Sequence, residues 1–214
     1  MDQDISGRMK SGAARWSTGG WKIFAVALPI LVAIPAVMIG RGGVSHYSVL
    51  TAVRASAIAA LLAFIAPFTA SAALALHPSA LTRYVRGRRR YFGIAFAFAM
   101  LVHIGCVALL FRVNPDQSVN PAMFILGVLG YLFIAALFAT SFDRTTDLLG
   151  REAWHRLHLI GSWYVWGYFM LIMLKAFPSA PAIYGPLLAL ASGAAGFRWA
   201  RRNRLLLQPL PSTR

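Results

Sequence analysis

The sequence is poor in acidic residues and in charge altogether. Only 13% of its 214 residues are charged, and 6 Asp and Glu stand against 21 Lys and Arg. A soluble domain carries roughly a quarter charged residues, so water is a poor solvent for most of this chain. The hydrophobic content of 58% and the mean hydropathy of +0.63 indicate an integral membrane protein instead.

Cysteine is almost absent as well. Cys106 is the only one in the sequence, which excludes an internal disulfide and any metal or redox site built from paired cysteines. The sequence also has no GxGxxG or P-loop motif for a nucleotide. We therefore expect that this chain does not itself take a hydride from a nicotinamide cofactor.

Apolar segments long enough to cross a bilayer recur along the chain. They lie at 21–40, 50–76, 91–111, 122–142, 154–177 and 182–198. A segment in hydrocarbon must satisfy its own backbone hydrogen bonds, so each is expected to be a helix. The sequence thus predicts an all-α integral membrane bundle of six transmembrane helices at 21–198, between a tail at 1–20 and a basic tail at 199–214.

The basic residues stand at the ends of these segments. If the N-terminus is cytoplasmic, 17 of the 21 Lys and Arg lie on the cytoplasmic side, and the four outside are Arg41, Arg54, Arg112 and Lys175. This bias follows the positive-inside rule and predicts that both tails are cytoplasmic. Because the charge does not gather on one soluble face, the net charge of +15 is no sign of nucleic-acid binding. The expected contact is membrane lipid.

Ionisable side chains inside a membrane are costly, so each one is a functional hypothesis. His103 lies about 18–20 Å along the segment 91–111 by the helical rise. His158 lies near the cytoplasmic end of 154–177, with His155 just before it, and His77 ends 50–76. A neutral imidazole suits haem iron as an axial ligand. The alternative for each is a hydrogen bond to a neighbouring helix or a place at the interface.

Two stretches around these histidines resemble the ferric reductase-like transmembrane family. In GRRRYFGIAFAFAMLVHI, the basic pair Arg89–Arg90 is followed by Gly93 and then by His103. A second stretch, TSFDRTTDLLGREAWHRLHLIGSWY, is similar to the family's junction of its fourth and fifth helices. The matching residues there are Thr140, Ser141, Leu149, Gly150, Trp154, Leu157 and His158.

The resemblance covers about residues 50–175. Over this range the sequence looks most like the haem-binding membrane subunits of bacterial periplasmic methionine sulfoxide reductase systems. It implies one or two b-type haems, with His103 and His158 as iron ligands and Trp154 beside them. Arg89 and Arg90 could steady haem propionates or the phosphate of FMN, or anchor the chain to anionic headgroups. The resemblance also implies the bacterial inner membrane, a redox partner protein, and a flavin, quinol or reductase as the electron donor.

One departure from the family's pattern concerns the segment 154–177. The family has a further histidine about thirteen residues after the one that matches His158, and this sequence has Leu171 there. Met170 and Met173 flank that position; a thioether can ligate haem iron, and methionine also fills gaps in apolar helices.

The expected depths of the two histidines raise a second difficulty. His103 is deeper than His158 by about 8–10 Å if both helices start level, whereas two ligands of one iron must lie at the same depth. Either the helix with His158 starts deeper, or the histidines serve different haems, or the haem site has decayed.

The sequence therefore predicts a transmembrane electron-transfer subunit that binds b-type haem and passes electrons from a cytoplasmic donor to an outer acceptor. It would be a subunit of an oxidoreductase with no nucleotide-binding domain of its own. The alternative is a non-redox membrane scaffold or small transporter that keeps the fold with an incomplete haem site.

Overall fold

The computed structural model describes residues 18–142, 145 and 148–207, and in this part of the chain helices joined by short loops are the only regular secondary structure. The long helices are α2 (Thr18–Gly42), α3 (His46–Leu76), α5 (Arg89–Val113), α6 (Pro121–Ala139), α8 (Arg151–Ala176) and α9 (Pro181–Leu207). The short elements are helix α4 (Ala80–Gly87) and the single 3₁₀ turn η1 (Phe177–Ser179). The all-α prediction is confirmed for the described residues.

The helices begin where the sequence supplies capping groups. Ser45 and Ser48 form a reciprocal capping box at the start of α3, and Ser79 and Thr82 form another at the start of α4. The side chain of Asn120 accepts hydrogen bonds from two backbone amides at the start of α6. Each cap satisfies amides that the helix leaves unpaired, so the polar loops fix where the apolar helices start.

Within the described residues, five helices are long and apolar enough to cross a membrane: α2, α3, α5, α6, and α8 with the turn after it. They match the first five predicted segments to within a few residues. The sixth, α9, is not among them, because its described sequence is less apolar on average. Helix α4 was not predicted, since its sequence ALTRYVRG is short and polar. The predicted tails lie mostly outside the described residues, although α9 continues to Leu207.

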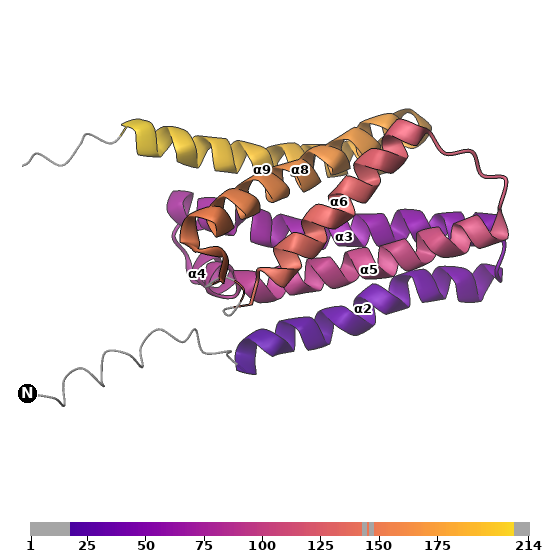
Figure 1. The fold of residues 1–214 in the computed structure, drawn as a ribbon, viewed down its shortest axis with the longest axis horizontal. Helices are drawn as coiled ribbons and strands as arrows, with labels where there is room; N and C mark the ends of the chain where they lie inside the picture. Colours follow the sequence, from indigo (N-terminus) through magenta and orange to yellow (C-terminus); the bar gives the residue numbers. More distant parts are fainter. Residues whose placement is uncertain (1–17, 143–144, 146–147, 208–214) are drawn as a thin grey trace, which may run out of the picture.

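The long helices run side by side along the long axis of the molecule, and α6 crosses them obliquely (Figure 1). Helix α3 is the centre of the bundle, because it packs against α2, α5 and α9. Helix α8 joins α9 to α6. Helix α2 starts and α9 ends at the same end of the bundle, beside α4 (Figure 1). The fold thus places the first turn of α5 and the last turns of α9 at one end.

Aromatic side chains fill the middle of the bundle. Phe64 packs against Phe96 and Phe169, with ring centroids 5.1 and 6.0 Å apart, so that α3, α5 and α8 meet there. Buried side chains from α2, α6 and α9 complete the same cluster: Leu31, Ile134 and Ala194. This interior is apolar and closely packed, so a polar group that enters it needs its own partner.

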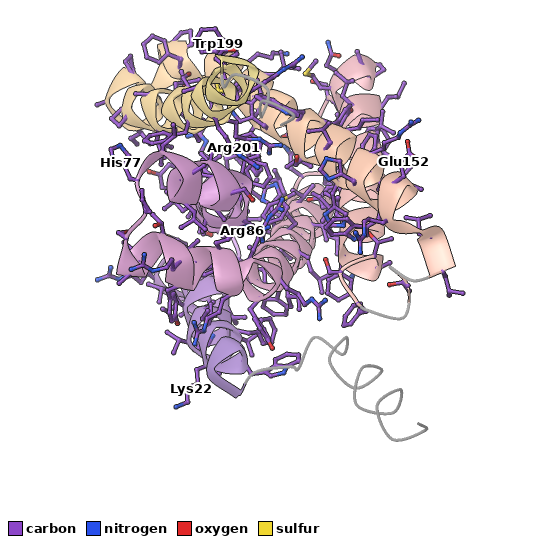
Figure 2. All side chains as sticks on the ribbon, turned by 90° about the vertical axis from the view of Figure 1, so that its left-hand side faces the viewer. Lys22, His77, Arg86, Glu152, Trp199 and Arg201 are labelled. Atoms are coloured by element: carbon purple, nitrogen blue, oxygen red, sulfur yellow. The ribbon has the colours of Figure 1, made fainter. Side chains whose placement is uncertain are left out.

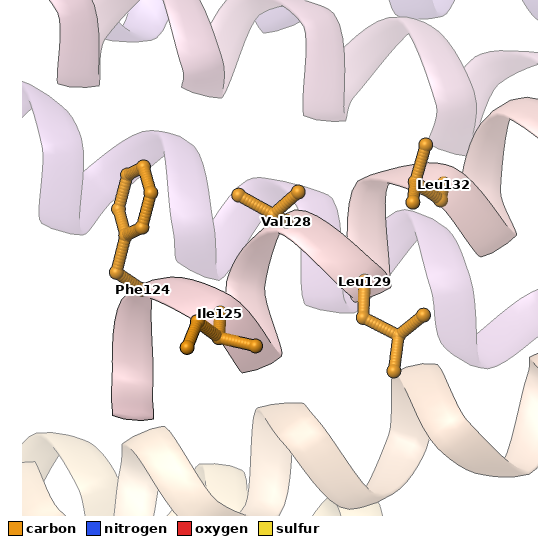
Figure 3. Close-up of a pocket in the computed structure, with 5 residues that line it drawn as sticks. All are labelled: Phe124, Ile125, Val128, Leu129 and Leu132. Carbon is orange, nitrogen blue, oxygen red and sulfur yellow. The ribbon is translucent and has the colours of Figure 1, made fainter. Parts of the chain in front are cut away.

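The outer surface of the bundle is apolar too. Only 11% of the most apolar stretch of α2, and of α6, is buried inside the protein. A hollow on α6 is lined by apolar side chains alone (Figure 3): Phe124, Ile125, Val128, Leu129 and Leu132. Soluble monomers rarely expose contiguous apolar surface of this extent, so the helices fit a multi-pass membrane protein in contact with lipid.

Candidate functional site

His103 lies on α5 and its ring contacts α3 at the side chain of Ser56 and the backbone of Val53. Its Nδ1 is 3.0 Å from the hydroxyl of Ser56, and that hydroxyl lies 3.0 Å from the carbonyl oxygen of Val53. A serine hydroxyl has one hydrogen, and the carbonyl can only accept it. The assignment that satisfies both contacts has Ser56 donating to Val53 and accepting from Nδ1–H of His103, and we assign the imidazole this tautomer.

This tautomer leaves the other ring nitrogen of His103 with its lone pair. No hydrogen-bond partner meets Nε2 among the residues that the structure describes. The ring is half-buried, and Ser56 beside it is 2% exposed. A histidine that donates through one nitrogen and keeps the other free has the arrangement of a metal ligand with its supporting hydrogen bond.

Two further polar groups surround this position. The thiol of Cys106, one turn further along α5, is buried and lies against Ser56. Tyr131 on α6, close enough to Cys106 for the two groups to interact, has a buried hydroxyl that finds no partner in the described part of the chain. Sequence reasoning passed over Tyr131, because a tyrosine in an apolar helix is usually an interface residue. Its only sequence signal was its position in the middle of the segment 122–142.

His158 on α8 is held quite differently. Its Nε2 is 3.1 Å from the hydroxyl of Thr140, which in turn lies 2.7 Å from the carbonyl oxygen of Ala136. By the same counting of hydrogens, Thr140 donates to Ala136 and accepts from Nε2–H of His158. The ring stacks on Trp154 at 4.3 Å, and the indole of Trp154 donates to the carbonyl of Thr140 at 2.8 Å. The Thr–Ser and Trp-x-x-Leu-His motifs thus form one bracket between α6 and α8.

The structure does not bring the two histidines together. His158 lies close enough to Arg89 for the two charges to interact, so it is level with the first turn of α5. His103 is fourteen residues further along the same helix, which is about 21 Å by the helical rise. The aromatic cluster around Phe96 fills the space between the two levels. One iron cannot take both as ligands in this arrangement.

Arg89 belongs to a group of basic side chains at the same end of the bundle. Its Nε donates to the carbonyl of Pro67 at 2.9 Å, and the charges of Arg86 and Arg201 lie near it. Arg198 lies near Arg89 and Arg201. We call Arg86, Arg89, Arg198 and Arg201 the arginine cluster. Figure 2 looks onto this end, with Arg86 and Arg201 towards the middle and His77 at the edge.

The other candidate residues lie apart from His103. His77 and His155 are exposed, and the ring of His77 contacts Phe197 at 6.5 Å between centroids. Arg90 follows Arg89 in the first turn of α5. Met173 is 5% exposed and packs with Met170 in the cluster formed by α3, α8 and α9. These methionines face α3 and α9 rather than α5, where His103 lies.

No known protein family, no curated protein and no solved structure matches this chain. Among the described residues, no three or more His, Cys, Asp or Glu side chains gather where they could hold a metal ion. A bound haem needs only one or two axial ligands from the protein. Nε2 of His103 suits the role of such an axial ligand. His103 and His158 cannot both ligate one haem iron, because they lie at different levels.

Proposed function

We propose that this protein is a transmembrane electron-transfer subunit that binds b-type haem through His103. The observation that supports this most is the imidazole itself. It lies in an apolar bundle, its Nδ1–H is bonded to Ser56, and its Nε2 lone pair has no partner among the described residues. Bound haem would supply the one-electron chemistry, and the chain would supply ligation, burial and orientation.

Ser56 is the positioning residue in this proposal. Its hydroxyl cannot donate to His103 while it donates to Val53, so it holds the imidazole in the ligating tautomer. The carbonyl of Val53, which accepts from Ser56, also lies close to the ring of His103. Helix α3 therefore determines which nitrogen of an α5 histidine can bind a metal.

His158 would ligate a second haem on the same electron-transfer path, at a different depth in the bundle. It lies about 21 Å from His103 along the bundle by the helical rise, near the end where α2 starts and α9 ends. To ligate through Nε2, its ring must leave Thr140. We therefore assign the first haem to His103. A second haem would bind at His158 only after its hydrogen bond to Thr140 is released.

We further propose that α9 is a sixth span, so that both termini lie in the cytoplasm of a bacterial cell. With 27 residues, it is longer than the about 20 residues that a span requires. It packs against both α3 and α8, and of its described side chains only Ala191 and Ala194 are buried, so its exposed apolar side chains would face lipid. Reporter fusions after Arg90 and Arg204 should report cytoplasm, and a fusion in the 112–121 loop should report the outside. The opposite result at two of these sites would refute the topology.

The haem proposal has a direct test. The full chain, purified in detergent, should show b-type bands in a reduced-minus-oxidised spectrum. His103→Ala should lose them, while His46→Ala, at the exposed start of α3, should keep them. A colourless wild-type protein with normal insertion would reject the proposal.

One observation favours the alternative of a non-redox membrane scaffold or small transporter. The bracket of Thr140, Trp154 and His158 is complete without a metal, since every polar atom named in it has a protein partner. In that case the motif is structural. The same spectrum separates the two functions, because only the first predicts haem in the purified protein.

A further inference from the structure

The arginine cluster places four positive charges from three helices at one end of the bundle. Arg86 is on α4, Arg89 on α5, and Arg198 and Arg201 on α9. Arg89 and Arg198 are half-buried. In the ranges 18–142, 145 and 148–207 the acidic residues are Asp116, at the opposite end, and Glu152, which pairs with Arg156. No described carboxylate therefore offsets the mutual repulsion of the cluster.

Neutral groups orient the two deepest guanidiniums. Arg89 uses Nε to bond the carbonyl of Pro67. Arg198 uses Nη1 to bond Ser162 at 3.1 Å, and its plane lies over Phe68 at 4.3 Å from the ring centroid. An arginine has five N–H donors, so most donors of both remain for another ligand. The contacts fix the positions of the charges without neutralising them.

We propose that this cluster binds the phosphate of an anionic phospholipid headgroup. Guanidinium groups bind phosphate through paired hydrogen bonds. Basic pockets between transmembrane helices, at the level of the headgroups, are suited to such lipids. The phosphate supplies a negative charge for the cluster, since Glu152, the described carboxylate at this end, pairs with Arg156 instead. Convergence of α4, α5 and α9 gives it donors from three directions.

The surface of α9 favours a lipid over a soluble phosphate. Ile183, Leu190 and Phe197 are exposed by 54%, 42% and 43%, and their spacing of seven residues keeps them on one face of the helix. Arg201 follows Phe197 by one turn on that face. A headgroup at Arg201 would thus have an exposed apolar stripe for its acyl chain. Trp199, 65% exposed, lies at the level where tryptophan meets headgroups.

This site is independent of the proposed haem site. His103 is about 21 Å along α5 from Arg89 by the helical rise, and none of the four arginines contacts it. Loss of haem in His103→Ala should therefore leave lipid binding unchanged. Failure of the haem proposal and failure of the lipid proposal are separate results.

The test uses the full chain in detergent, titrated with phosphatidylglycerol or with phosphatidylcholine and followed by native mass spectrometry. The variant is Arg86→Gln/Arg201→Gln, since Arg86 is exposed and Arg201 is half-buried, and their loss leaves the contacts of Arg89 and Arg198 intact. The control is Arg41→Gln/Arg112→Gln, which removes the same charge from exposed positions at the opposite end.

We expect the wild type and the control to retain phosphatidylglycerol in preference to phosphatidylcholine. The double variant should bind phosphatidylglycerol about 25-fold more weakly, because each arginine beside an anionic headgroup contributes about fivefold. Equal loss in the control would show diffuse attraction and overturn the site. Displacement of the lipid by millimolar inorganic phosphate would overturn the lipid as its ligand, and equal retention of both lipids would overturn the proposal altogether.

Discussion

The surroundings of His103 and His158 differ in one respect that decides their chemistry. His103 gives its Nδ1–H to Ser56 and keeps Nε2 free, whereas His158 gives its Nε2–H to Thr140 and stacks on Trp154. Both hydroxyls have already donated their hydrogen to a helix carbonyl. The hydroxyls therefore leave different nitrogens without a partner in the described part of the chain, Nε2 in His103 and Nδ1 in His158, and only the ring of His158 is also held by stacking. Four substitutions test this difference.

The largest effect is expected for His103→Ala. If Nε2 of His103 is the iron ligand, this variant should lose most of the bound haem while its expression and insertion stay normal. The measurement is haem per protein from the pyridine haemochrome spectrum. The matching change, His158→Ala, should leave the His103 haem in place. Equal loss in both variants would mean that the two histidines act at one site, against the separation seen along α5.

Ser56→Ala tests the hydrogen bond that positions His103. Without the acceptor, Nδ1–H loses its partner and the ring can rotate or change tautomer. Loss of such a supporting contact typically lowers metal affinity about 10–100-fold, so we expect haem to dissociate correspondingly faster and the haem midpoint potential to shift. Thr69→Val is the control, because the hydroxyl of Thr69 bonds only its own helix, at the carbonyl of Ile65. Unchanged haem binding in Ser56→Ala would remove Ser56 from the site.

Thr140→Val tests the hydrogen bond that holds the ring of His158. The substitution leaves Nε2–H of His158 without its acceptor at a half-buried position, which costs about 1–3 kcal/mol. Thermal unfolding in detergent should show the loss, with Thr69→Val again as the control. Haem bound at His103 should not change. A variant as stable as the wild type would show that the bracket of Thr140, Trp154 and His158 is not structural.

The smallest effect is expected for Leu171→His, which restores the histidine that the family's pattern has on this helix. Leu171 is half-buried on α8, about 20 Å along the helix from His158 and so at a depth closer to that of His103. We expect a modest gain in haem, or a spectrum shifted towards low-spin bis-histidine ligation. The gain should vanish in the double variant with His103→Ala. A gain that survives there would show that His103 is not its partner.

Much of the fold followed from the sequence, because a lipid environment restricts the choice of structure. Apolar length alone predicted the first five long helices, since a segment in hydrocarbon has to be a helix. Apolar length did not identify α4, which is short and polar. It predicted α9 as a transmembrane span like the other five. Helix α9 is less apolar than the other predicted spans although few of its described side chains are buried, so only its contacts with α3 and α8 in the assembled bundle place it among them.

The candidate site was predictable as a set of residue types and not as an arrangement. His103 and His158 stand out because histidine is rare in apolar segments, and their different levels follow from counting residues along the helices. Arg198 and Arg201 were assigned to a basic tail and to topology, and nothing in the sequence joins them to Arg86 and Arg89, more than one hundred residues earlier. The one sequence feature that could have indicated the arginine cluster was the spacing of Arg198 and Arg201, three residues apart at the end of an apolar segment.

The sequence by itself determined that the chain is helical, that its apolar surface suits lipid, and where its histidines and arginines lie along each helix. These properties depend on local composition and on the helical rise, which need no partner. Tertiary structure alone decided which nitrogen of each histidine is free and that four arginines share one end of the bundle. Both depend on contacts between helices distant in sequence, since a hydroxyl on α3 or α6 fixes the tautomer of a ring on α5 or α8.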